Sequence, residues 1–168
     1  NKMLNTFKTV SSRQFINKSN HCNLSKFNFH TSTILANKIG AATSGVQIPK
    51  HILNLNVDLY DKKANMFLED LTEQLEAISE EDPTFISSVD SAQGVIEFDL
   101  EKVGTYVINK QPPNKQIWLS SPISGPFRFD YDSIKDKWVS LRDDSMDLPS
   151  HLNSEIKQTS NDKYELEL

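Results

Sequence analysis

Sulfur and imidazole ligands are nearly absent from this sequence of 168 residues. It contains one cysteine, Cys22, and of its four histidines only His51 and His151 lie beyond residue 45. A disulfide needs two cysteines, while zinc, haem and iron–sulfur clusters are held mainly by thiolate and imidazole. The sequence therefore excludes a disulfide framework, and it indicates that any metal bound after residue 45 is held by oxygen.

Long apolar runs are also missing. No stretch approaches the roughly 18 apolar residues of a membrane-spanning helix, so we expect no membrane span. The formal net charge of −5 has the wrong sign for the phosphate backbone, so we expect no nucleic-acid partner. A hydrophobic content of 37% with nine phenylalanines is enough for one folded domain with extensions.

Acidic residues are absent before Asp58, so the charge is unevenly distributed. Of the 18 Lys and Arg residues, seven precede Asp58, which leaves 11 to accompany all 23 Asp and Glu residues. A basic leader that is rich in Ser and Thr and free of acids is typical of a mitochondrial transit peptide. We therefore interpret residues 1–45 as a transit peptide, with a disordered basic tail as the alternative.

The first strong helical pattern begins at Val57 and continues to about Glu80. Asn56 is a suitable N-cap, Asp58 favours the positive end of the helix dipole, and Pro83 marks the end. The apolar residues recur at steps of three and four, which places them on one face. This stripe consists of Val57, Tyr60, Ala64, Leu68, Leu71, Leu75 and Ile78.

The hydrophobic period then changes to two, which predicts strands. A second helix is expected around Leu148, Leu152 and Ile156, followed by a C-terminal tail, residues 161–168. One helix, five or six strands on short turns and another helix predict an α+β fold over residues 46–160. This fold is a two-layer αβ-sandwich, with two helices on one face of a five- to six-stranded antiparallel sheet. The expected strands are Ser87–Ser91, Gly94–Leu100, Gly104–Lys110, Gln116–Ser120, Pro126–Asp130 and Lys137–Leu141.

Strand alternation predicts a sheet face without carboxylates. If Ile117 and Leu119 point inward, Trp118 points outward, and Arg128 does the same on the next strand. Trp and Arg are enriched at binding hot spots, and an arginine can stack on an indole. We interpret this face as a protein-binding surface, although Trp118 could instead stabilise the rim of the sheet. The predicted outward set is Asn109, Gln111, Gln116, Trp118 and Arg128.

The first helix carries a second candidate surface, which is strongly acidic. Between residues 58 and 101 there are 13 acids against two lysines, Lys62 and Lys63. This segment contains no P-loop, GxGxxG, HExxH or nucleophile–base pair. Exposed carboxylates form shallow sites for hard cations, including iron; the alternative is a solvated face that provides solubility. The candidate ligands are Asp58, Asp61, Glu69, Asp70, Glu73, Glu76 and Glu80 on the helix, and Asp90 on the adjoining strand.

Three blocks of this sequence closely resemble the frataxin family. The most specific is GTYVINKQPPNKQIWLSSPISGPFRFD, residues Gly104–Asp130; WVSLR and LNLNVDLYDKKANMFLEDLTEQLEAISEEDP match more loosely. The resemblance implies the same αβ-sandwich and a protein of the mitochondrial matrix. It also implies weak binding of Fe(II) and Fe(III) at several acidic positions. These correspond to Asp58, Glu69, Glu73, Glu76, Glu80 and Asp90.

The resemblance further implies docking on the complex of cysteine desulfurase and iron–sulfur scaffold protein. The corresponding sheet residues are Asn109, Lys110, Gln111, Gln116, Trp118 and Arg128. Two alternatives to this iron-binding and docking function remain. One is a ferroxidase that oxidises Fe(II) with oxygen and stores iron in self-oligomers, and the other is a purely structural adaptor. Two departures from the family pattern, Pro149 and His151, predict a shorter or less stable last helix, which packing of Tyr164, Leu166 or Leu168 would offset.

Overall fold

The computed structural model describes residues 47–143 and 145–168, so the expected leader lies outside the described residues. A single turn of helix, α1 (Lys50–Leu53), precedes the long helix α2 (Val57–Glu81). Asn56 caps α2, because its side chain accepts hydrogen bonds from the backbone N–H groups of Asp58 and Leu59 at 2.7 and 3.2 Å. The predicted helix is confirmed, whereas α1 was not predicted because four residues are too few to show a period.

Six antiparallel strands follow in chain order across one sheet, so each strand pairs with its sequence neighbours. A 3-10 turn, Pro112–Asn114, joins the third strand to the fourth, with Lys115 in the left-handed region at φ 53°. The predicted sheet is therefore confirmed with six strands. They are β1 (Ile86–Ala92), β2 (Val95–Leu100), β3 (Gly104–Gln111), β4 (Gln116–Ser121), β5 (Gly125–Asp132) and β6 (Lys137–Val139).

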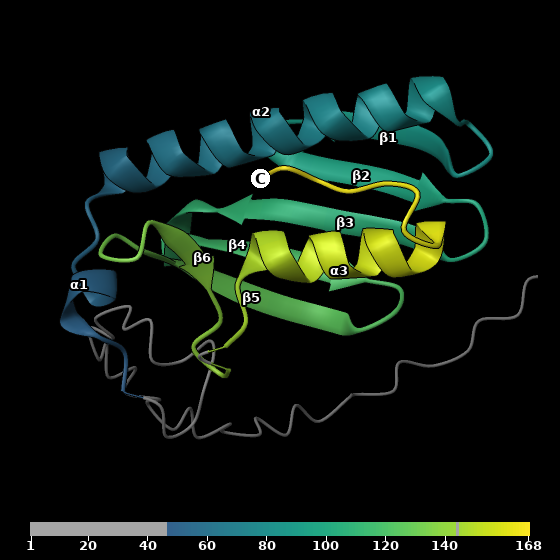
Figure 1. Ribbon diagram of the computed structural model, residues 1–168. Helices are drawn as coiled ribbons and strands as arrows, with labels where there is room; N and C mark the ends of the chain where they lie inside the picture. Colours follow the sequence, from purple (N-terminus) through teal and green to yellow (C-terminus); the bar gives the residue numbers. More distant parts are fainter. Residues whose placement is uncertain (1–46, 144) are drawn as a thin grey trace, which may run out of the picture. The chain divides into compact units, whose positions relative to one another are not determined.

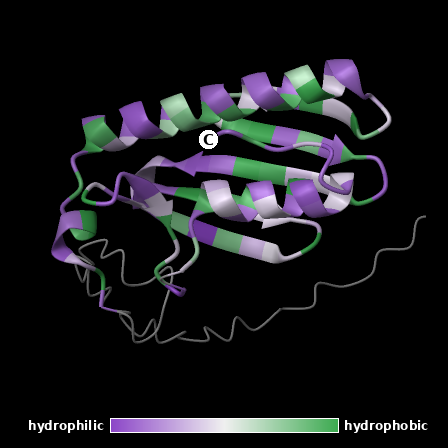
Figure 2. Ribbon diagram, in the orientation of Figure 1, coloured by the Kyte–Doolittle hydropathy of each residue, from purple (hydrophilic) through white to green (hydrophobic). Residues whose placement is uncertain are grey.

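The hydrophobic core lies between the sheet and two helices that cover the same face, α2 and α3 (Leu148–Ser160) (Figure 1). Hydrophobic and hydrophilic residues alternate along the strands, as expected when one sheet face is buried (Figure 2). Trp138 belongs to this core, with 4% of its surface exposed and its ring against Tyr60 and Tyr131. No helix in the described part of the chain combines the length and apolar character needed to cross a bilayer.

The last helix continues one turn beyond Ile156, the last residue of the expected apolar stripe. α3 has 13 residues; Asp147 caps it by accepting a hydrogen bond from Ser150 N at 2.9 Å, and Pro149 lies in its first turn. His151 Nε2 faces Glu155 Oε1 one turn later at 3.3 Å, and its ring packs against Phe127 with 4.7 Å between ring centres. The expected second helix is therefore confirmed, while a helix shorter or less stable than in the family stays a prediction.

The C-terminal segment runs between α2 and α3 (Figure 1). Tyr164 and Leu166 are buried there, whereas Leu168 remains 36% exposed. The side chain of Gln74 on α2 donates a hydrogen bond from Nε2 to the backbone oxygen of Glu167 and accepts one at Oε1 from the backbone N–H of Glu167, both at 2.8 Å. The expected packing of the tail is confirmed for Tyr164 and Leu166, and it ties both helices together.

Candidate functional sites on the acidic helix and the outer sheet face

The acidic surface follows from the helical period of α2, because residues three and four apart share a face. Like charges at this spacing repel each other, so the arrangement disfavours the helix taken alone. All but one of the expected ligands are exposed; the exception, Asp61, is half-buried. The exposed set, which we call the acidic ridge, is Asp58, Glu69, Asp70, Glu73, Glu76 and Glu80 on α2 and Asp90 on β1.

Three carboxylates of the acidic ridge open onto one groove. Glu69, Glu73 and Glu76 line a hollow of about 350 Å³ beside the turn between β1 and β2. Asn65 and Thr72 from α2 and Ser91 from β1 contribute further oxygen atoms to its walls. Among the described residues, these three glutamates form no hydrogen bond or ion pair. Their oxygen atoms are therefore available to a cation from solution.

Asp61 is arranged differently from the rest of the expected ligands. Its carboxylate forms an ion pair with Lys110 Nζ at 3.0 Å, and the same ammonium donates to Asn65 Oδ1 at 2.9 Å. Lys63 is likewise engaged, with Asp136 at 2.7 Å. In the N-terminal half of α2, Asp61 is thus neutralised and Asp58 stays exposed, so most of the free negative charge on α2 lies from Glu69 onward.

The acidic ridge does not form an enclosed metal centre. Within residues 47–143 and 145–168 no group of three or more His, Cys, Asp or Glu side chains converges on one point. Dinuclear carboxylate centres instead collect Glu and His side chains that project into the core of a helix bundle. The geometry is that of several shallow sites with few protein ligands each, which suits weak binding of a hard cation.

The outer sheet face carries a stack of two side chains from adjacent strands. Trp118 on β4 lies between Asn109 on β3 and Arg128 on β5 in the pairing register. The guanidinium carbon of Arg128 is 4.6 Å from the centre of the Trp118 ring, and both residues are half-buried. Strand alternation had placed both outward, and the structure brings them together.

Two residues of the predicted binding set are not surface contacts on this face. Gln116 points outward but is only 3% exposed, because it is covered by its polar neighbours. Lys110 points to the other side of the sheet, where it meets Asp61 and Asn65 on α2. Successive residues of a strand face opposite ways, so Lys110 cannot share a surface with Asn109.

The outer face also contains a carboxylate, contrary to our prediction. Asp130 pairs with Gln116 in the register and accepts a hydrogen bond from Gln116 Nε2 at 2.8 Å. It is 2% exposed, so the face still presents little negative charge to solvent. Strand alternation could have located Asp130 on this face, because it lies two residues after Arg128 on the same strand and therefore points the same way.

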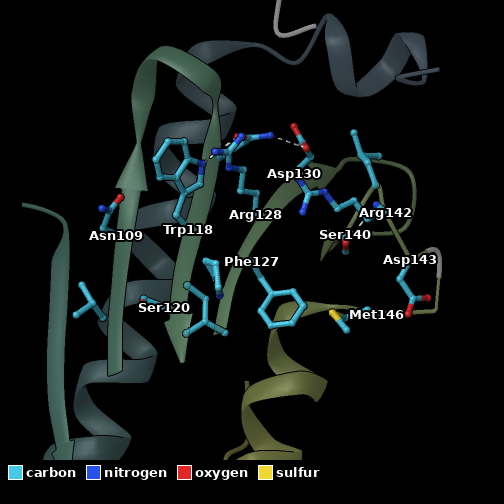
Figure 3. Close-up of a pocket in the computed structure, with 15 residues that line it drawn as sticks. Asn109, Trp118, Ser120, Phe127, Arg128, Asp130, Ser140, Arg142, Asp143 and Met146 are labelled. Carbon is cyan, nitrogen blue, oxygen red and sulfur yellow. Dashed lines mark hydrogen bonds between the residues drawn. The ribbon is translucent and has the colours of Figure 1, made fainter. Parts of the chain in front are cut away.

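A cavity of about 550 Å³ adjoins the Trp118–Arg128 stack (Figure 3). Its lining includes the apolar side chains of Phe127 and Met146, together with Ser140 and Arg142, which follow β6. We predicted a strand that continues to Leu141, but β6 ends at Val139, and the chain then leaves the sheet toward this cavity. No local signal in the sequence would have found Ser140 and Arg142 there.

Taken together, these features define a two-layer αβ-sandwich that presents its candidate sites on the surface. The family model for the frataxin-like domain matches residues 53–162. The mitochondrial frataxin homolog of Saccharomyces cerevisiae is 44% identical over 117 residues, which are 70% of this chain and 66% of that protein. Mitochondrial frataxin of Dictyostelium discoideum is 43% identical over 116 residues, which are 69% of this chain and 56% of that protein.

A solved structure gives the same result. The crystal structure of trimeric yeast frataxin, complexed with ferrous, has a TM-score of 0.53 and 43% identity. The similarity covers 67% of this chain and 97% of that one. The chain belongs to the frataxin-like family, and the names of its curated relatives place it in the mitochondrion. It spans about two thirds or less of the two curated relatives described above.

Proposed function

We propose that this protein binds iron as cargo on the acidic ridge and docks through its outer sheet face onto the cysteine desulfurase–scaffold complex of the mitochondrial matrix. There it promotes iron–sulfur cluster assembly. The observation that carries this proposal is the separation of the two surfaces. The helices cover one face of the sheet, and the Trp118–Arg128 stack lies on the other, so an iron-loaded ridge leaves the docking face accessible.

Iron binding is supported by the donor chemistry of the groove beside α2. Fe(II) and Fe(III) accept carboxylate oxygen ligands, and Glu69, Glu73 and Glu76 offer them without a competing cation among the described residues. A bound cation also offsets the repulsion between these neighbouring charges. The yeast relative that was crystallised with ferrous supports iron as the cargo.

An anaerobic titration with Fe(II), followed by ¹H–¹⁵N NMR, tests this part of the proposal. Paramagnetic broadening should be confined to α2 and the adjoining strands, within residues 58–99, while β4 and β5 stay sharp. The triple variant Glu69→Gln, Glu73→Gln and Glu76→Gln should lose the broadening around the groove. Equal broadening in this variant, or broadening centred on β4, would contradict the assignment.

Docking is supported by a donor left without an acceptor on the outer face. Arg128 Nη1 is fully shielded from solvent and has no hydrogen-bond acceptor among the described residues. A buried donor without a partner costs about 1–3 kcal/mol, and a rotation of the half-buried Arg128 side chain that brings Nη1 to a partner's carbonyl or carboxylate oxygen would recover it. Binding of the purified desulfurase–scaffold complex to immobilised protein, with and without Arg128→Met, measures this contact. Equal affinity of the two proteins would count against it.

Ferroxidase chemistry in an iron-loaded oligomer is the second candidate. The yeast relative is trimeric, and contacts between copies would bring carboxylates from several acidic ridges together. Oxygen consumption by Fe(II)-loaded protein, compared with the triple glutamine variant, separates oxidation from binding. Oxygen uptake no faster than that of free Fe(II) would exclude this activity, and sedimentation of the same samples reports the oligomer.

A further inference from the structure

A buried carboxylate and a buried amide lie beside the Trp118–Arg128 stack, two residues along the same strands. Asp130 is 2% exposed and Gln116 is 3% exposed, although both belong to the outer face of the sheet. Gln116 Nε2 donates to Asp130 Oδ2 at 2.8 Å, and Trp118 Nε1 donates to Gln116 Oε1 at 3.0 Å. The three side chains therefore form a chain of hydrogen bonds that leads to the indole.

The direction of this chain follows from the chemistry of its members. A carboxylate accepts hydrogen bonds, and an indole N–H only donates. The amide of Gln116 can serve both only with its NH₂ toward Asp130 and its oxygen toward Trp118. The opposite orientation would place oxygen against oxygen and N–H against N–H. Asp130 thus determines the orientation of Gln116, and Gln116 determines where the indole N–H points.

The backbone beneath this chain is held from the helix layer. Tyr60, at 0% exposure on α2, donates its hydroxyl to the carbonyl oxygen of Gln116 at 2.9 Å. The position of β4 at this residue is therefore set from one side of the sheet and the side-chain direction from the other. Neither contact needs a binding partner, so the indole is oriented before docking.

We propose that Asp130 and Gln116 are positioning residues for docking: they hold the indole of Trp118 in the pose in which Arg128 stacks on it. This inference rests on the proposed docking function. Because the indole N–H is already used within the protein, Trp118 offers a partner its ring surface. Arg128 Nη1 is shielded and has no acceptor among the described residues, so a partner's oxygen atom reaches it only if the guanidinium turns outward on docking. Gln116, expected to touch the partner, acts through Trp118 instead.

The test combines an NMR measurement of the indole with partner binding. Gln116→Met keeps the length of the side chain but cannot accept the indole N–H, and Asp130→Leu removes the group that orients Gln116. Either variant should speed water exchange of the Trp118 indole proton, while the indole of Trp138 is the internal control. Each should also weaken binding to the desulfurase–scaffold complex about 10-fold. Having two independent variants keeps the test informative if one does not fold.

Two further variants separate positioning from a general effect on structure. Asp130→Asn retains an oxygen that accepts from Gln116, so it should restore slow indole exchange and most of the binding. Gln158→Met makes the same chemical change at an exposed position of α3 and should alter neither indole exchange nor binding.

Slow indole exchange in both Gln116→Met and Asp130→Leu would overturn the inference. Undiminished binding by Gln116→Met or Asp130→Leu, despite fast indole exchange, would also overturn the inference. If Trp118→Ala loses binding in the same experiment, the docking function itself still stands. Normal binding by Trp118→Ala would instead refute the docking function.

Discussion

Arg128 and Trp118 are direct cross-strand partners on β5 and β4, with the guanidinium carbon 4.6 Å from the centre of the indole ring. Both side chains are large and half-buried, and the indole N–H of Trp118 already donates to Gln116 Oε1. Residues of this kind supply most of the binding energy at protein interfaces. The stack is therefore the part of the outer face where a substitution should affect binding most.

Trp118→Ala should leave the fold intact and weaken binding to the desulfurase–scaffold complex by about 2 kcal/mol or more, which is roughly 30-fold in the dissociation constant. The fold survives because Trp118 lies on the face opposite the helices, outside the main core. Circular dichroism checks the fold, and biolayer interferometry with the purified complex measures the affinity. Unchanged binding by the folded variant would refute the role of the indole.

Glu73→Gln should change stability and iron binding in opposite directions. Glu73 lies three residues before Glu76 and four residues after Glu69. Each like-charge pair at this spacing costs about 0.2–0.5 kcal/mol. Removing the central charge should raise the free energy of unfolding by roughly that amount per pair, while the affinity for Fe(II) falls. Urea unfolding and anaerobic calorimetry measure the two effects. Glu101→Gln, an exposed acid outside the acidic ridge, should leave iron binding unchanged.

Tyr106→Phe should destabilise the protein by about 1.5–3 kcal/mol, the range for a hydrogen bond to a charged group. The Tyr106 hydroxyl is buried and donates to Glu155 Oε2 at 2.8 Å, and Ser121 Oγ donates to the same oxygen at 2.7 Å. The substitution removes one of these donors from a carboxylate that is only 5% exposed. Chemical denaturation measures the loss. In the Glu155→Gln background, Tyr106→Phe should cost clearly less, and an equal cost in both backgrounds would contradict this account.

Lys163→Met should reduce stability at neutral pH and have little effect in acid. The hydrogen bond from Lys163, followed by that from Thr84, lowers the pKa of Asp82 to about 2. Because this pKa is depressed in the folded state, the stabilisation is present above the ordinary Asp pKa of about 4 and is lost as the pH falls toward 2. The difference in urea midpoint between the two proteins should therefore be largest above pH 5 and shrink in acid.

Lys62→Met provides the control for this pH series, since Lys62 is exposed and forms no ion pair with any described residue. Its difference from the unmodified protein should stay small at every pH. A Lys163→Met difference that persists undiminished at pH 2.5 would mean that the lysine acts through packing of the tail and not through Asp82.

The elements of this fold could be predicted because their signals are local. The apolar stripe from Tyr60 to Ile78 and the Asn56 cap locate α2 within one residue, and period-two alternation locates the strands. Trp118 and Arg128 could be assigned to one face because parity within each strand does not depend on the rest of the protein. The C-terminal end of α3 at Ser160 could not be predicted, since the contact there between Tyr164 N and Ser160 Oγ is one that no periodic pattern reveals.

Charge and exposure were less predictable than position. Asp61 and Lys110 are 49 residues apart in a chain of 168 and meet only because β3 passes beneath α2. Gln116 has the parity of a surface residue, yet Asp130 and Trp118 cover it from neighbouring positions. Whether the carboxylates of the acidic ridge act as ligands is still a prediction, which the iron titration tests.

The sequence alone determined which residues form helices and strands, which side of each strand they occupy and where acidic charge accumulates, because these depend on spacing along the chain. Only the tertiary structure decided which outward residues are covered, which acids are neutralised and which donors lack an acceptor. Those properties depend on atoms from segments far apart in sequence that come within a few ångströms, and hydrogen bonds and ion pairs act only at such distances.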